Sequence, residues 1–378
     1  MAGAGTQVGV YQFLECIGSG GMADVYLAVK QRFSDIRQFY AIKAIRPKFA
    51  HQDEYVEMFV DEARVLSNIH HPNLITFHDI LEKDGQCFIV MEFLNGMDFR
   101  RLSKKLDADD RELPISVAVG AVIQAARGLH CAHEARSIDG EPLELIHRDV
   151  SPQNLFITYD GFVKLLDFVV AKANFQEETS ARDVVKGKIS YLSPEQCKGT
   201  ELDRRTDIFS LGAALYEALT DRKPFPGSNK AEIIQTLVDE PPRPPSSVDP
   251  EIPRELEEAV LRALEKDRTA RFPTAQAFAD RLEEVAETHD LPIGQRAISS
   301  FLHDSVPDAI EATEERLSEL AAQSREDLNV SLDVIEVSYD EGERRTVNLG
   351  PDALAGVRNL GNCTVFGLEG DIRETFDF

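Results

Sequence analysis

The chain has 378 residues, enough for two or three structural units, and 43% of them are hydrophobic, enough for a sizeable core. A balance of 66 acidic to 41 basic residues gives a net charge of −25. Because so acidic a surface repels nucleic acid and anionic membranes, we expect neither as a partner.

Cysteine usage and hydropathy indicate a cytoplasmic protein. The five cysteines are scattered, odd in number and without metal-ligand spacing, which fits a reducing compartment better than disulfides. No stretch reaches the roughly 18 apolar residues of a membrane span. We expect no signal peptide, because the first residues lack a charged region followed by an apolar one.

The start at 1–10 is small and polar, and we expect it to be flexible. A glycine-rich run follows, Gly18-Ser-Gly-Gly-Met-Ala-Asp-Val25. Strands are predicted on both sides of it, at 11–17 and 25–30. Glycines let backbone N–H groups approach phosphates closely. A strand after the run indicates a loop that covers a bound nucleotide. The alternative, a Rossmann turn, needs a helix there and a ribose-binding acid that is not evident.

A lysine between apolar neighbours, Lys43, lies on the next predicted strand, at 39–45. Its ammonium would be costly inside the protein unless it were paired. The helix predicted at 53–68 carries Glu62, a candidate partner, although acids abound on this helix and a solvated Glu62 is the alternative. The paired histidines that follow, in His70-His-Pro-Asn-Leu74, favour a structural turn over a metal site.

Two more strands, predicted at 74–81 and 86–92, precede a change to helical periodicity at 99–106 and 116–135. Next comes Ile146-His-Arg-Asp-Val-Ser-Pro-Gln-Asn-Leu155, then a predicted hairpin with its turn at Asp160-Gly161. The hairpin ends in Asp167. Asp149 can accept the proton of an attacking hydroxyl, while Asn154 and Asp167 can hold Mg²⁺ against phosphates. An ordinary polar hairpin is the alternative. However, the order H-R-D-x-x-x-x-N followed by D-F is a much more specific pattern than three polar residues alone.

These motifs, in this order, resemble those of bacterial, eukaryotic-like serine/threonine protein kinases over residues 11–287. Further matches are Leu192-Ser-Pro-Glu195, the run from Asp207 to Gly212, and Arg271. The resemblance implies an α+β, bilobal protein-kinase fold, with a β-rich N-lobe at 11–95 and a helical C-lobe at 96–287. It also implies ATP and Mg²⁺ as cofactors and serine or threonine hydroxyls of protein substrates as acceptors.

Residue roles follow from the same resemblance. Lys43 with Glu62 would position phosphates, Arg148 would bind a phosphorylated activation segment, and Thr179 and Ser180 are the favoured autophosphorylation sites. Three residues have structural roles: Asp207 would hold the catalytic-loop backbone, and Glu195 and Arg271 would form a buried ion pair. The nucleotide-binding residues, with Met91 as gatekeeper, would be Gly18, Ser19, Gly20, Gly21, Met22, Val25, Ala41, Lys43, Met91, Glu92, Leu94 and Leu155.

Three positions depart from the family. Val169 follows Asp167-Phe168 in place of glycine, Ser151 stands where a lysine is usual, and Lys188 stands where a threonine is usual. We hypothesise that Lys188 brings the missing positive charge to Asp149 from the opposite strand; an exposed lysine is the alternative. The departures favour a rival interpretation, a pseudokinase or nucleotide-binding scaffold, whereas the complete phosphoryl-transfer set favours an enzyme.

The resemblance ends at residue 287, after helices predicted at 211–219, 230–238, 255–265 and 275–284. Residues 288–330 are predicted to form an acidic helical linker, with a helix at 297–323. Strands predicted at 332–337, 344–349 and 363–368 indicate a small, acidic, β-rich module at 331–378. Binding of a regulator, self-association and packing on the kinase lobe all remain open for this module.

Overall fold

A computed structural model describes residues 5–33, 36–137, 139–168 and 188–332, and four short strands beyond them; side chains are described up to residue 323, except at 31–36 and in the gaps. The chain divides into two compact units. The larger unit is built from residues 16–26 and 40–311. The smaller comprises residues 2–15, 27–39 and 312–378.

A six-stranded sheet forms the N-terminal part, in the strand order β1-β2-β3-β4-β6-β5. Strand β6 pairs antiparallel with β4 and β5, and its register sets Lys43 opposite Ile89. Ile89 and Ile42 are fully buried, so Lys43 stands on a strand fixed by its apolar neighbours. The strands are β1 (Gln7–Val8), β2 (Tyr11–Ser19), β3 (Ala23–Phe33), β4 (Ile36–Ile45), β5 (Phe77–Lys83) and β6 (Gln86–Glu92).

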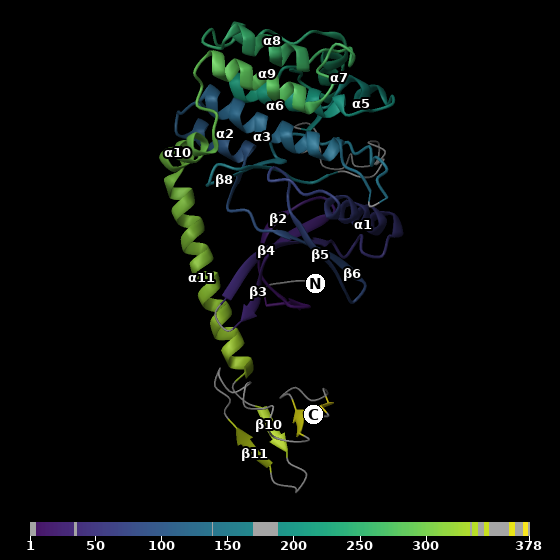
Figure 1. Ribbon diagram of the computed structural model, residues 1–378, viewed down its shortest axis with the longest axis vertical. Coiled ribbons are helices and arrows are strands. Elements are labelled where there is room, and N and C mark those ends of the chain that lie inside the picture. The colour runs from purple at the N-terminus through teal and green to yellow at the C-terminus, as the bar shows by residue number, and fades with distance from the viewer. Residues whose placement is uncertain are drawn as a thin grey trace. The chain divides into compact units, whose positions relative to one another are not determined.

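Helix α1 (Asp53–Ser67) lies against β5 and β6 (Figure 1). Its apolar face buries Phe59, Ala63 and Leu66, which recur at the three-to-four-residue spacing of one helix face. That face fixes the rotation of the helix about its axis. Glu62 is therefore held at one angular position beside the buried stripe.

The helical part of the larger unit is organised around α3, which packs on α6 and α9 (Figure 1). A three-stranded sheet of order β7-β8-β9 lies beside α3 and carries the predicted hairpin. The helices are α2 (Phe99–Ala108), α3 (Ile115–His133), α5 (Pro194–Lys198), α6 (Arg205–Thr220), α7 (Lys230–Asp239), α8 (Arg254–Ala263), α9 (Ala275–Thr288) and α10 (Gln295–Ser305). The strands are β7 (Gly96–Asp98), β8 (Leu155–Thr158) and β9 (Val163–Leu165), and a 3₁₀ turn covers Pro245–Ser247.

Helix α3 alone, among the helices described, is long and apolar enough to cross a membrane. However, 67% of its most apolar stretch is buried inside the protein. It has the surroundings of a core helix.

The first part of the predicted linker at 288–330 is packed in the larger unit. Ile298 and Leu302 on α10, and Val306 between α10 and α11 (Pro307–Leu332), are completely buried. Two helices stand where the sequence predicts one, at 297–323. Val306 leaves the helical region, with φ −134°, and Pro307 begins the next helix because it has no N–H to donate backwards.

In the smaller unit, α11 is tied to β2 by an ion pair between Arg316 and Glu15, with 2.8 Å between Nη2 and Oε2. Leu320, one turn further on, is buried. A four-stranded antiparallel sheet of order β11-β10-β12-β13 follows in the chain. The sequence predicts its first three strands but not the last: β10 (Ile335–Ser338), β11 (Arg344–Val347), β12 (Cys363–Phe366) and β13 (Arg373–Phe376).

Candidate active site

Lys43 lies between two carboxylates from distant parts of the chain. Its Nζ is 2.7 Å from Glu62 Oε1 and 2.9 Å from Asp167 Oδ1. Strand β4 supplies the lysine, helix α1 the glutamate, and the residue two positions after β9 the aspartate. The Lys43 side chain is 15% exposed and that of Glu62 13%, so the predicted partner is not a solvated surface acid.

The charges of this cluster stabilise one another. Burial alone would lower the pKa of Lys43, but the charges of Asp167 and Glu62 outweigh it and raise that pKa above its ordinary value. The ammonium in turn holds the pKa of Asp167 below its usual range. Burial raises the pKa of Glu62, and Lys43 opposes that rise. Lys43 is therefore a fixed cation, and Asp167 a fixed anion whose side chain is 53% exposed.

The catalytic-loop residues Asp149 and Asn154 are held together by the amide of Asn154. Its Nδ2 donates to the backbone O of Asp149 at 2.7 Å and to Oδ2 of the same residue at 2.9 Å. Both N–H bonds of the amide are thereby used on one residue. The carboxylate of Asp149 is fixed in orientation, and the amide oxygen of Asn154 remains as an acceptor.

Asp207, fully buried at the start of α6, fixes the loop from below. It accepts hydrogen bonds from the backbone N–H groups of His147 and Arg148, each at 2.8 Å, and contacts His133 Nε2 at 2.8 Å. Burial would raise the pKa of Asp207, but the hydrogen bond and charge of His133, with His147, hold it below its ordinary value. These bonds keep Arg148 at φ +65°, a left-handed conformation that costs energy for a residue with a side chain.

Lys188 contacts Asp149 directly, with 2.5 Å between Nζ and Oδ2. The lysine side chain is 41% exposed and the aspartate 21%. Ser151, at the position where a lysine is usual, is 2% exposed, and its hydroxyl has no hydrogen-bond partner among the described residues. The positive charge beside Asp149 thus comes from residue 188.

The predicted nucleotide-binding residues lie on β2, β3, β4, β6, β8 and the segments between them. Ala41 stands opposite Met91 across β4 and β6, and both are 8% exposed. The glycine-rich turn is closed by a 2.9 Å bond from Gly20 N to Ala23 O. At its base, Arg46 and Ser19 both donate to Asp24 Oδ1, at 3.0 and 2.7 Å. Glu92 Oε1 is bonded to Lys164 at 2.5 Å and accepts from Thr76 N at 2.7 Å, while the backbone N–H of Glu92 donates to Thr76 O at 3.0 Å.

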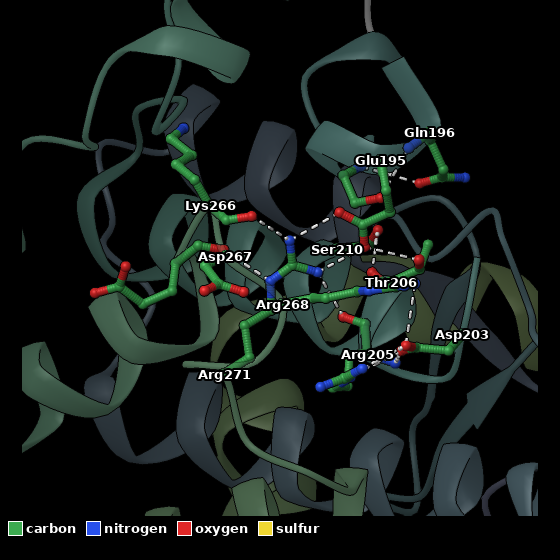
Figure 2. A network of polar contacts seen from close by, with 12 residues as sticks. Glu195, Gln196, Asp203, Arg205, Thr206, Ser210, Lys266, Asp267, Arg268 and Arg271 are labelled. Atoms are coloured by element: carbon green, nitrogen blue, oxygen red, sulfur yellow. Dashed lines mark hydrogen bonds and ion pairs between the residues drawn. The ribbon is translucent and has the colours of Figure 1, made fainter. Parts of the chain in front are cut away.

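Arg271 and Glu195 form the predicted buried ion pair (Figure 2). Two parallel bonds of 2.7 and 2.8 Å join the guanidinium to the carboxylate, and Thr206 Oγ1 adds a third at 2.8 Å. The arginine side chain is completely buried, and its remaining N–H groups donate to the backbone O atoms of Arg205, Glu265 and Lys266. Burial would raise the pKa of Glu195, but the hydrogen bonds and charge of Arg271 keep it below its ordinary value.

One connecting residue was missed in the sequence, Gln196. It closes a capping box with Ser193 at the start of α5 and donates from Nε2 to Arg148 O at 2.9 Å. The signal was available, since Ser193-x-x-Gln196 has the spacing of a capping box. Its contact with the catalytic loop could not be predicted, because it depends on tertiary packing. Val169, Thr179 and Ser180 lie outside the described residues.

Comparison with known proteins agrees with this geometry. Residues 11–282 match the model of the protein kinase domain. The tyrosine-protein kinase MasK of Myxococcus xanthus is 39% identical over 78% of this chain and 46% of its own length. The serine/threonine-protein kinase PrkC of Bacillus subtilis is 34% identical over 73% of this chain and 42% of its own. The chain thus spans under half the length of these two relatives.

A solved structure shares the fold. The kinase domain of Mycobacterium tuberculosis PknI is 26% identical and superposes with a TM-score of 0.56, covering 75% of this chain and 99% of the PknI chain. The matched region holds every residue of the cluster around Lys43 and Asp149. The chain belongs to the protein kinase family, within the bacterial kinases of the eukaryotic-like serine/threonine type.

Proposed function

We propose that the protein is an ATP- and Mg²⁺-dependent kinase that transfers the γ-phosphate of ATP to serine or threonine hydroxyls of other proteins. The observation that carries the proposal is the position of Lys43, bonded at once to Glu62 and Asp167 at 2.7 and 2.9 Å. Such an arrangement aligns a cation for the α- and β-phosphates beside an anion for the metal. A scaffold that only binds partners has no need of both.

The donor set fits Mg²⁺. Asn154 and Asp167 offer an amide oxygen and an ionised carboxylate, which are hard oxygen ligands. Among the described residues, no group of three or more His, Cys, Asp or Glu side chains forms a metal cage. That suits Mg²⁺, which protein kinases hold with few side chains, water and the phosphates. The bound ion would neutralise charge on the phosphates.

The protein's own residues would then divide the work. Asp149, held by Asn154, accepts the proton of the acceptor hydroxyl as that oxygen attacks the γ-phosphorus. Lys43 holds the non-transferred phosphates, and Lys188 places a positive charge beside Asp149, where the γ-phosphate meets the hydroxyl. The glycine-rich turn covers the phosphates and keeps water out.

The acceptor class is the finer part of the proposal. Serine and threonine are favoured because PrkC and other similar bacterial kinases bear that name. Tyrosine is the second candidate, since MasK is named a tyrosine kinase and is 39% identical. Activation-segment phosphorylation at Thr179 and Ser180 remains part of the proposal, as does a regulatory or self-association role for residues 331–378.

The test is a phosphate-transfer assay with radiolabelled ATP, Mg²⁺ and three matched peptides that differ only in carrying Ser, Thr or Tyr. Wild-type protein should label the Ser or Thr peptide, while Asp149→Asn and Lys43→Met should each abolish labelling. A wild-type protein that binds ATP in a thermal-shift experiment but labels no peptide would support the scaffold interpretation. Labelling of the Tyr peptide alone would overturn the proposed acceptor class.

A further inference from the structure

Three polar side chains outside the phosphate-transfer set form a compact cluster: Tyr191, Glu217 and Lys223. Lys223 Nζ lies 2.5 Å from Glu217 Oε1 and also donates to the hydroxyl of Tyr191. That hydroxyl donates to Glu217 Oε2. The lysine ammonium stands 4.2 Å from the centroid of the tyrosine ring. Both oxygens of the Glu217 carboxylate therefore accept hydrogen bonds from groups of the protein itself.

The cluster lies beside the place where the acceptor hydroxyl would be phosphorylated. Tyr191 N donates to Lys188 O at 3.2 Å, and Lys188 contacts Asp149. Arg100 N also contacts the catalytic loop, since it donates to the backbone O of Pro152 at 3.2 Å. The charge of Arg100 acts on both Tyr191 and Lys223. A protein chain that brings its hydroxyl to Asp149 would pass close to these residues.

Two members of the cluster are partly exposed. Glu217 is 26% exposed and Lys223 33%. Burial holds the pKa of Lys223 below its ordinary value, and the charge and hydrogen bond of Glu217 oppose that effect only in part. With Lys223 in place, Glu217 has its counter-charge inside the protein, and the exposed Arg100 adds a further cation to the same area. Without Lys223, a half-buried carboxylate next to the acceptor site would attract a cationic side chain of the substrate.

We propose that Lys223 is a specificity-determining residue. Because it pairs with Glu217 inside the protein, the Glu217 carboxylate does not select substrates that carry arginine or lysine near the phosphorylated residue. The inference rests on the proposed kinase function. The substrate class that it predicts is a protein segment that is neutral or acidic around its acceptor.

The experiment compares peptides with the same acceptor in which arginine replaces alanine at each of the flanking positions in turn. The measured quantity is the ratio of kcat/KM for the arginine peptide to that for the alanine peptide. Wild-type protein should give ratios at or below one. Lys223→Met should raise the ratio about 3- to 10-fold at one or two positions, mainly through KM, as expected for one partly exposed ion pair.

Three further variants serve as controls. Lys223→Arg keeps the cation and should give the same ratios as wild type. Lys230→Met removes an exposed lysine of α7 and should also leave the ratios unchanged. The double variant Glu217→Gln with Lys223→Met should lose the gained preference, because no carboxylate remains. Unchanged ratios in an active Lys223→Met protein would overturn the inference alone, as would a gain that persists in the double variant. A wild-type protein without activity would overturn the proposed function, and this inference with it.

Discussion

The ammonium of Lys188 lies 2.5 Å from Asp149, whereas Ser151, two residues after Asp149, has a buried hydroxyl without a partner among the described residues. The geometry agrees with an exchange in which a cation absent from position 151 is supplied from position 188. A contact shows where the charge is, whereas a role in catalysis requires that its loss slow the chemical step.

Replacing Lys188 by methionine should lower kcat about 10- to 100-fold, because a positive charge is lost where charge develops in the transition state. The KM for ATP should stay within about twofold, since Lys43 still holds the other phosphates. Steady-state kinetics of peptide phosphorylation measure both. Lys198→Met, an exposed lysine on α5, is the matched control. An activity near that of wild type would show Lys188 to be a surface lysine that happens to reach Asp149.

Breaking the pair between Glu195 and Arg271 should destabilise the protein, because the remaining partner would be a buried group without its counter-charge. Glu195→Gln leaves a completely buried guanidinium without its anion, which costs about 3–5 kcal/mol in the free energy of unfolding. Urea denaturation of the whole protein measures this loss. Glu258→Gln breaks an exposed pair with Arg254, where the side chains are 84% and 55% exposed, and should cost less than about 0.5 kcal/mol. Equal losses in both variants would contradict the role of burial.

The same pair predicts that the stability of the protein depends on pH in the acidic range. Because the pKa of Glu195 is lower in the folded protein than its ordinary value, the folded state binds fewer protons than the unfolded state as pH falls. The stability that Glu195 contributes is therefore complete above its unfolded-state pKa and declines as pH falls through the folded one. Glutamine does not titrate. The difference in unfolding free energy between wild type and Glu195→Gln should be constant near neutral pH and narrow below about pH 4.5. A constant difference down to acid pH would mean that Glu195 does not titrate with folding.

The sequence predicts two kinds of site residue: those that lie a few positions apart on one loop, and those whose burial would cost energy unless they had a partner. Asp149 and Asn154 lie five apart on one loop, and a lysine flanked by Ala41, Ile42 and Ala44 must find a partner, which leads to Glu62. Contacts such as Gln196 with Arg148 arise only once α5 is seated on the catalytic loop. No local pattern encodes that approach.

The region after residue 287 shows a second reason for missed structure. Acidic composition suggested a linker, yet Ile298, Leu302 and Val306 recur at helical spacing and are completely buried. A short apolar stripe among many charges gives a weak signal, and the surface that receives it is visible only in the fold. The break before Pro307, in contrast, was readable from the proline itself.

The docking of this region on α3 can be tested at Gly120, in the first half of that helix. A Cβ at this position would lie 2.5 Å from the backbone O of Ile293, the residue two before α10. In a free helix Gly→Ala would stabilise by about 1 kcal/mol, but here the clash with backbone should reverse the sign and cost about 1–3 kcal/mol. Urea denaturation gives the sign directly. Gly294→Ala, which meets nothing within 4 Å, is the control and should change stability by less than about 1 kcal/mol. A stabilised Gly120→Ala protein would mean that residues 289–306 do not pack on α3 in solution.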